Sequence, residues 1–218
     1  MNPLPPLAID FVTETFPPEI NGVAMTVGRL VGGLRERGHR VRVVRPRQGE
    51  ADQGGEHELA LRGLPLPGYP GLRFGLPAGR RLHREWAQRK PDLVHVVTEG
   101  PLGWSAVSAA RRLGIPVTSG FHTNFDRYSV HYGLGWMRPA VSAYLRTLHR
   151  RTRATLVPTA ALAADLAGEG LPGVRVVGRG VDAELFDPGR RRAALREAWS
   201  AAGEGPVCLY VGRLAPEK

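Results

Sequence analysis

Short apolar runs alternate with amphipathic helical patterns along most of this chain. Residues 7–12 form an apolar run of strand length, and in residues 23–37 apolar side chains recur at helical spacing after a polar loop. Gly38 stands where a glycine commonly ends a helix, and residues 41–44 fit the next strand. The start of the chain therefore predicts a β-α-β unit.

The alternation continues over short connections. Further strands are predicted at residues 57–62, 93–97, 117–121, 155–157, 174–177 and 207–211. Further helices are predicted at residues 78–89, with Leu82 and Trp86 facing inward, and at 102–113, 136–151, 160–168 and 190–200. This order predicts an α/β fold, a Rossmann-like doubly wound parallel sheet with helices on both faces.

The last apolar run, residues 207–211, ends in Gly212-Arg213, and Lys218 closes the chain. A buried parallel strand that leads into a glycine and two cations suits a phosphate, because ligands of open α/β sheets collect at the carboxyl ends of strands. We expect an amino-terminal domain over residues 1–186. We expect residues 187–218 to be a linker, a helix and the first strand of a second Rossmann-like domain, so that the natural protein is longer.

Composition limits the classes of protein. The 42% hydrophobic content supports a real core, and the net charge of +10 favours anionic partners such as nucleotide phosphates, acidic lipid headgroups or nucleic acid. Nucleic acid is disfavoured because the aromatic residues are not interleaved with the arginines. The single cysteine, Cys208, excludes an internal disulfide and is expected to be buried. No window reaches the length of a membrane span, so we expect a cytoplasmic protein or one peripheral on the cytosolic face.

Two segments carry candidate binding groups. Asn21 and Gly22 directly precede a predicted helix, where an anion can meet backbone N–H groups, although a plain loop glycine fits equally well. The segment S-G-F-H-T-N-F-D-R-Y-S-V-H-Y-G begins where a predicted strand ends, which favours a site role for His122 and leaves His131 undecided. No His, Cys and carboxylate set has the spacing of metal ligands, so no metal site is predicted.

The predicted helix at residues 136–151 has an apolar stripe and a cationic end. The stripe contains Tyr144, Leu145 and Leu148, and the cations include His149 and Arg150. An ordinary core-facing helix whose cations favour its C-terminus explains most of this pattern. A surface that docks on an anionic membrane is the alternative interpretation.

Three stretches resemble family-four retaining glycosyltransferases, which have the GT-B architecture of two facing Rossmann-like domains. They are T-E-T-F-P-P-E-I-N-G-V-A, S-G-F-H-T-N-F, and V-G-R-G-V-D-A-E-L-F-D-P followed by Y-V-G-R-L-A-P-E-K. The chain resembles the amino-terminal half, and within the family it is most similar to bacterial GDP-mannose-dependent α-mannosyltransferases and sulfoquinovosyl-diacylglycerol synthases. The family usually has asparagine where this chain has Arg179.

The resemblance implies roles for individual residues. It places Asn21 and Gly22 at the donor phosphates, His122 in the sugar site, and Arg213 and Lys218 on the diphosphate, whose developing charge they would stabilise without a metal. Our acceptor-binding candidates are Glu99, Asn124, Arg127 and Tyr128.

The function implied by the resemblance is transfer of a sugar from a nucleotide sugar, GDP-mannose first, to a lipid or glycan acceptor, with an anionic membrane surface as a possible partner and no cofactor. The base pocket and the paired glutamates of the family belong to the carboxyl-terminal domain, so we expect this chain alone to be inactive. Two alternatives stay open. One is a glycosyltransferase that uses a UDP-sugar, and the other is a non-catalytic module that binds a membrane or a partner.

Overall fold

The computed structural model describes residues 5–65, 73–121, 138–199 and 205–211. The chain divides into two compact units, Met1–Gly178 and Arg179–Lys218. The domain boundary after residue 186 stays a prediction.

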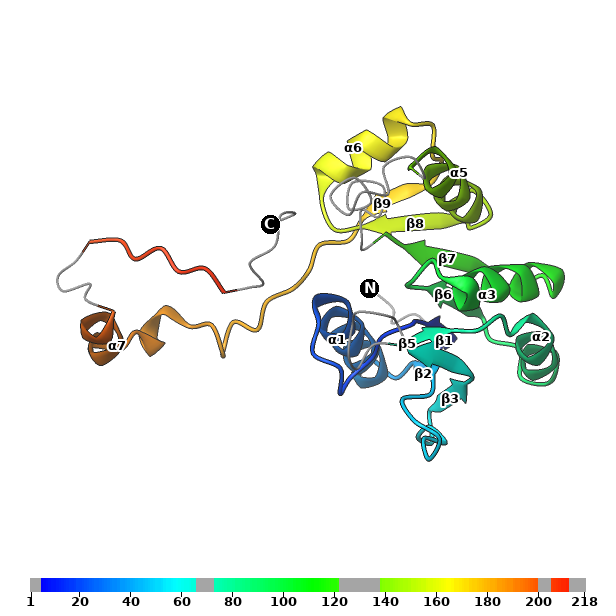
Figure 1. Ribbon diagram of the computed structural model, residues 1–218, viewed down its shortest axis with the longest axis horizontal. Coiled ribbons are helices and arrows are strands. Elements are labelled where there is room, and N and C mark those ends of the chain that lie inside the picture. The colour runs from blue at the N-terminus through cyan, green and yellow to red at the C-terminus, as the bar shows by residue number, and fades with distance from the viewer. Residues whose placement is uncertain (1–4, 66–72, 122–137, 200–204, 212–218) are drawn as a thin grey trace. The chain divides into compact units, whose positions relative to one another are not determined.

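A seven-stranded sheet, parallel throughout, forms the centre of the first unit (Figure 1). In chain order its strands are β1 (Ala8–Val12), β2 (Arg40–Pro46), β3 (Glu58–Leu61), β6 (Leu93–Val96), β7 (Val117–Gly120), β8 (Ala154–Val157) and β9 (Val174–Val176). The described helices of this unit are α1 (Gly22–Glu36), α2 (Gly79–Gln88), α3 (Pro101–Arg112), α5 (Arg138–His149) and α6 (Ala160–Gly168). The order across the sheet is β3-β2-β1-β6-β7-β8-β9, which confirms the predicted doubly wound α/β fold.

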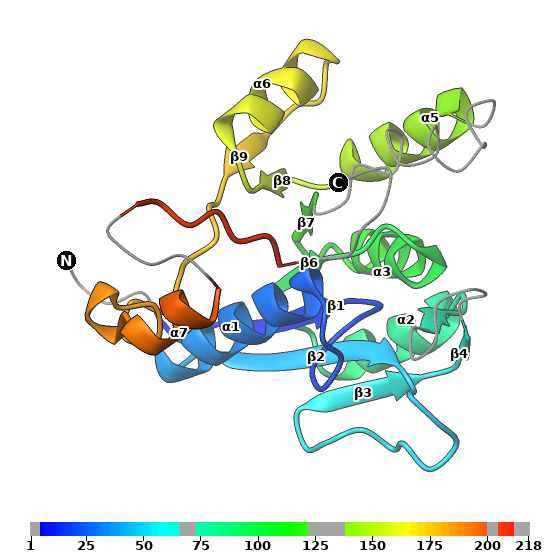
Figure 2. The same ribbon diagram turned by 60° about the vertical axis from the view of Figure 1, so that its left-hand side comes forward.

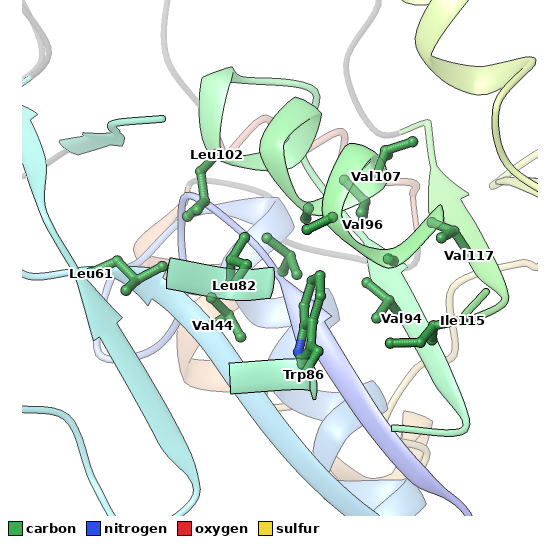
Figure 3. Close-up of a cluster of buried hydrophobic side chains, with 14 of the residues drawn as sticks. Val44, Leu61, Leu82, Trp86, Val94, Val96, Leu102, Val107, Ile115 and Val117 are labelled. Carbon is green, nitrogen blue, oxygen red and sulfur yellow. The ribbon is translucent and has the colours of Figure 1, made fainter. Parts of the chain in front are cut away.

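Alternation along β1 sends successive side chains to opposite faces of the sheet. Ile9 and Phe11 pack with Val27 and Val31 of α1 on one face. On the other face Val12 belongs to a larger cluster with residues of α2 and α3 (Figure 3). Leu82 and Trp86 of α2 are fully buried in this second cluster, as their spacing predicts. A third cluster joins Phe121, Leu145, Val157, Leu166 and Leu171 beneath α5 and α6.

Glycines end three of the helices in the left-handed backbone region, Gly38 with φ 85°, Gly114 with φ 67° and Gly170 with φ 75°. A short antiparallel hairpin, β4 (Gly63–Pro65) with β5 (Arg73–Gly75), was not predicted. A Cβ on Gly75 would lie 2.6 Å from Leu102, so the hairpin approaches α3 without room for a side chain at that position. Figure 2 shows β3 beside β2 and the loop that connects them.

The second unit contains helix α7 (Ala193–Ala198), which lies within the helix predicted at residues 190–200. A 3-10 turn, η2 (Pro188–Arg190), comes just before α7. The strand predicted at residues 207–211 is absent, and Leu209, Tyr210 and Val211 are exposed. Cys208 is exposed as well, contrary to the expectation of a buried thiol. The physical reason is that a parallel strand needs a hydrogen-bonding neighbour, and no described strand pairs with this segment.

Candidate functional site

The carboxyl edge of the sheet gathers the loops that follow β1 and β6. The N–H of Val97 donates to the carbonyl of Val12 over 2.8 Å, which carries the pairing of the two strands to their ends. Beyond them, the N–H of Glu14 donates to Thr98 Oγ1 over 2.9 Å. These bonds fix the two loops against each other at the edge where doubly wound sheets bind ligands.

Asn21 is the N-cap of α1 and Gly22 is the first residue of that helix. The Asn21 Oδ1 accepts the N–H groups of Val23 and Ala24 at 3.1 and 2.9 Å, and its Nδ2 donates to Thr15 Oγ1 over 2.6 Å. The Asn21 side chain is therefore fully engaged in holding the loop on the helix. Of the first three N–H groups of the helix, only that of Gly22 is left for a ligand while this cap is in place.

Glu14 is a site residue that the sequence patterns did not indicate. A Cβ on Gly100 would lie 2.1 Å from Glu14 Oε1, so the carboxyl occupies space that only glycine leaves open. The N–H of Gly75 donates to Oε2, whereas Oε1 has no hydrogen-bond partner among the described residues. Burial raises the pKa of Glu14 to about 7, and the N–H groups of Gly75 and Leu102 act in the opposite direction. This carboxyl can exchange a proton near neutral pH.

Glu99, an acceptor-binding candidate, is only 6% exposed and lies on a line of buried polar groups. Its Oε1 lies 3.5 Å from His149 Nε2. On the other side of the imidazole, Nδ1 is 2.8 Å from Ser119 Oγ, which is also 3.2 Å from Thr155 Oγ1. His149 lies in the last turn of α5 as predicted, but it is 1% exposed and so does not belong to an exposed cationic surface. Ser119 of β7 satisfies Nδ1, whereas Nε2 has no hydrogen-bond partner among the described residues.

Tyr144 contacts the same candidate from α5. Its hydroxyl donates to the backbone carbonyl of Glu99 over 2.6 Å, and its ring stacks on Trp104 with ring centroids 5.4 Å apart. Burial raises the pKa of Tyr144 to about 12, and the charges of Glu99 and Glu14 act in the same direction. The two carboxylates and the phenol therefore share one electrostatic environment.

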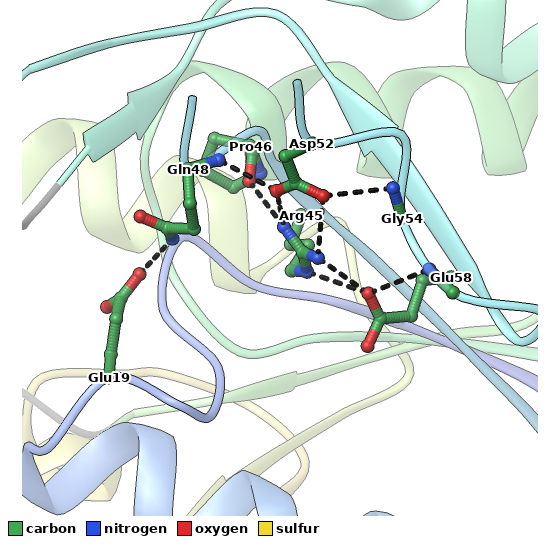
Figure 4. A network of polar contacts seen from close by, with 8 residues as sticks. Glu19, Arg45, Pro46, Gln48, Asp52, Gly54 and Glu58 are labelled. Atoms are coloured by element: carbon green, nitrogen blue, oxygen red, sulfur yellow. Dashed lines mark hydrogen bonds and ion pairs between the residues drawn. The ribbon is translucent and has the colours of Figure 1, made fainter. Parts of the chain in front are cut away.

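An ion-pair cluster holds the loop that follows β2 (Figure 4). The guanidinium of Arg45, which is 8% exposed, lies 2.5 Å from Asp52 Oδ2 and 2.6 Å from Glu58 Oε2. The hydrogen bonds that Arg45 donates to Asp52 hold the pKa of Asp52 well below its usual range, and the same hydrogen bonds raise the pKa of Arg45. Gln48 of the same loop donates to Glu19, so the cluster also ties this loop to the one that precedes α1.

Asn21 and Gly22 lie after β1 and Glu99 lies after β6, at the carboxyl edge of the sheet. The other site candidates lie outside the described residues, and their roles stay predictions: His122, Asn124, Arg127, Tyr128, Arg213 and Lys218. The signal that could have indicated Glu14 is an acidic residue two positions after a buried strand. No spacing pattern indicated His149.

The exposed cations near α5 gather at the other edge of the sheet. Arg150 and Arg153 lie between the end of α5 and the start of β8, and Arg111 of α3 donates to the carbonyl of Arg151 over 2.8 Å. Because β8 runs parallel to β1, this group marks the amino edge. A membrane bound there would lie at the edge opposite Glu14 and Glu99.

Among the described residues, no three His, Cys, Asp or Glu side chains are grouped so that they could hold a metal ion. Within the same residues, every helix is too short or too polar to cross a membrane. The arrangement at the carboxyl edge can offer a ligand one helix-terminal N–H, a carboxyl that ionises near neutral pH, and a second carboxyl next to a histidine.

Comparisons with known proteins agree with this architecture. Residues 20–185 match the family described as Glycosyltransferase Family 4. The chain is 35% identical over 216 residues to a GDP-mannose-dependent alpha-mannosyltransferase of Mycobacterium tuberculosis, a match that covers 96% of this chain and 57% of that protein. It is 32% identical over 204 residues to sulfoquinovosyl transferase SQD2 of Arabidopsis thaliana, covering 91% of this chain and 40% of that one.

Among solved structures, sucrose-phosphate synthase from Thermosynechococcus elongatus superposes with a TM-score of 0.63 at 14% identity, over 88% of this chain and 52% of that chain. This likeness concerns the fold and supports the GT-B type of sheet. The chain spans about half the length of the mannosyltransferases it matches. Since the family match covers more than half of its residues, the chain belongs to glycosyltransferase family 4.

Proposed function

We propose that this chain is the amino-terminal part of a retaining glycosyltransferase that moves mannose from GDP-mannose to a lipid or glycolipid acceptor. The observation that carries the proposal is the match of 96% of the chain to a GDP-mannose-dependent alpha-mannosyltransferase. The buried polar groups at the carboxyl edge support it, because that edge is where this type of fold receives its substrates.

In the proposed reaction, Gly22 and Asn21 face the donor diphosphate, and His122 hydrogen-bonds the transferred sugar. Arg213 and Lys218 hold the diphosphate and stabilise the negative charge that develops as it leaves, so no metal and no cofactor are needed. Because Asn21 caps α1 through its side chain, its proposed contribution is to orient the Gly22 N–H.

The acceptor is proposed to bind at Glu99, Asn124, Arg127 and Tyr128. The near-complete burial of Glu99 means that only a small part of its carboxyl can meet an acceptor hydroxyl. Tyr144 of α5 donates a hydrogen bond to the backbone carbonyl of that residue, and His149 of α5 lies 3.5 Å from its Oε1. We further propose that the protein works on the cytosolic face of an anionic membrane, where a lipid acceptor is available.

Transfer of labelled mannose from GDP-mannose tests the proposal, with the 218-residue chain and with the protein that carries a carboxyl-terminal domain. We expect transfer only by the longer protein. Transfer by this chain alone would refute the need for a second domain. Transfer from UDP-glucose but not from GDP-mannose would show that the donor is a UDP-sugar. Binding of anionic vesicles without any donor binding would favour a non-catalytic module.

Two substitutions in the longer protein test the site residues. His122→Ala is expected to lower turnover more than donor affinity, and Arg213→Ala to weaken donor binding. His83→Ala, at an exposed position of α2, is the matched control. Unchanged kinetics in either site variant would remove that residue from the site.

A further inference from the structure

A cavity of about 640 Å³ lies at the amino edge of the sheet. Its walls come from the starts of β1 and β2, the ends of α1 and α2, and the residues just before β3. Cavities of roughly 300–1,000 Å³ suit small molecules. The cavity lies at the start of β1, and Glu14 follows the end of that strand. At about 3.3 Å per residue the cavity is roughly 15 Å from Glu14, so it is distinct from the candidate functional site.

The cavity is strongly cationic. Five arginine and lysine side chains line it against two carboxylates, Asp10 and Glu56. Asp10 is already occupied, because it accepts two hydrogen bonds from Arg42, the shorter at 2.6 Å, and one from Trp86 Nε1 at 2.7 Å. Arg35 points its Nε and Nη2 at the carbonyl of Val41, at 3.2 and 2.9 Å. Arg42 and Arg35 therefore both make contacts that stabilise the fold.

The other three cations have no such role. Arg40, Arg89 and Lys90 are exposed, and their side chains make no hydrogen bond or ion pair with any described residue. Arg89 is the C-cap of α2, where a positive charge favours the helix dipole. That explanation does not extend to Arg40, which begins β2. Like charges around one concave surface repel each other, and an anion between them removes that cost.

We propose that this cavity binds the phosphate group of a phosphorylated small molecule. Arg40, Arg89 and Lys90 contact the phosphate oxygens, since guanidinium and ammonium groups form short charge-assisted hydrogen bonds to phosphate. The organic part of the ligand lies on the apolar lining, which includes the buried side chains of Val41 and Pro91. The site is a second binding site, at the opposite end of the strands from the proposed sugar transfer.

Lys90 gives the proposal a local readout, because Lys90 and Lys218 are the only lysines in the chain. Amine-reactive labelling followed by peptide mass spectrometry reports Lys90 separately from Lys218 and the α-amino group. We expect inorganic pyrophosphate to protect Lys90 in a saturable manner, relative to sodium chloride at equal ionic strength. Equal labelling in both salts would overturn the proposal.

Two charge-matched variants locate the effect. Arg40→Ala/Arg89→Ala removes two proposed ligands and should raise the pyrophosphate concentration for half-protection by about tenfold or more. Arg80→Ala/Arg84→Ala removes the same charge from exposed positions of α2 and should leave it unchanged. An equal loss of protection in both variants would show a general charge effect and refute the site. The single variant Arg40→Ala, at an exposed side chain, repeats the test with the α2 cap intact.

The phosphate can come from a soluble molecule or from a lipid headgroup. Vesicles of phosphatidylcholine with and without phosphatidic acid distinguish the two. Protection by glycerol phosphate in solution assigns the site to a soluble ligand. Protection by phosphatidic acid vesicles, without protection by glycerol phosphate, assigns it to a headgroup.

Discussion

The substitution Glu14→Gln replaces a buried carboxyl by a neutral amide of nearly the same shape. In the unfolded chain the carboxyl has a pKa near 4.5, and burial raises the pKa of Glu14 to about 7 in the fold. Between these values the folded state keeps a proton that the unfolded state has lost, so the free energy of unfolding falls as the pH rises. At about 1.36 kcal/mol per pKa unit, the loss reaches about 3 kcal/mol above pH 7.

Urea unfolding of the natural chain and of Glu14→Gln, from about pH 5 to about pH 8, measures this loss directly. The variant is expected to gain stability relative to the natural chain through this window and to level off at about 3 kcal/mol. Glu50→Gln, at an exposed position, is the control and should show a flat difference. A flat difference for Glu14→Gln as well would mean that the carboxyl is solvated, and the reasoning from burial would be wrong.

Three further predictions concern packing, ion pairs and membrane binding. Gly103→Ala places a Cβ 2.1 Å from a backbone carbonyl and should lower the free energy of unfolding, measured in urea, by about 2 kcal/mol. Gly32→Ala has open space around its Cβ in helix α1 and should raise the free energy of unfolding by up to about 1 kcal/mol. Arg45→Ala leaves two carboxylates without their cation and should cost about 3 kcal/mol at neutral pH, with a smaller cost in acid, both read from the same unfolding curves. Arg150→Ala/Arg153→Ala should reduce co-sedimentation with anionic vesicles at low salt, and sedimentation equal to that of the natural chain would exclude this edge as the contact.

The parallel sheet was predictable because strands β1, β6 and β8 are short apolar runs that are each followed by a helical pattern. Ile9 and Phe11 alternate with Asp10 and Val12, and Gly38 ends the first helix as expected. The apolar run at residues 207–211 was not sufficient for a strand. Apolar composition predicts burial only where a partner is available, and no described strand pairs there.

The site was only partly predictable. Asn21 and Gly22 could be placed because a helix start is a local feature of the sequence. His149 could not, because its partners Glu99 and Ser119 lie far away in the chain and meet only in the fold. A histidine among arginines at a helix end has the same local pattern whether it is solvated or buried.

Strand β1 is paired along its length on both sides, with β2 and with β6. Amides in such a strand exchange with solvent only when the whole unit opens, whereas amides of the edge strands β3 and β9 also exchange by local fraying. In a hydrogen-exchange experiment Phe11 and Val12 should therefore be among the slowest amides of the chain. The loop that carries Glu14 and Asn21 begins directly after them, so its first residues are attached to the part of the protein that opens least often.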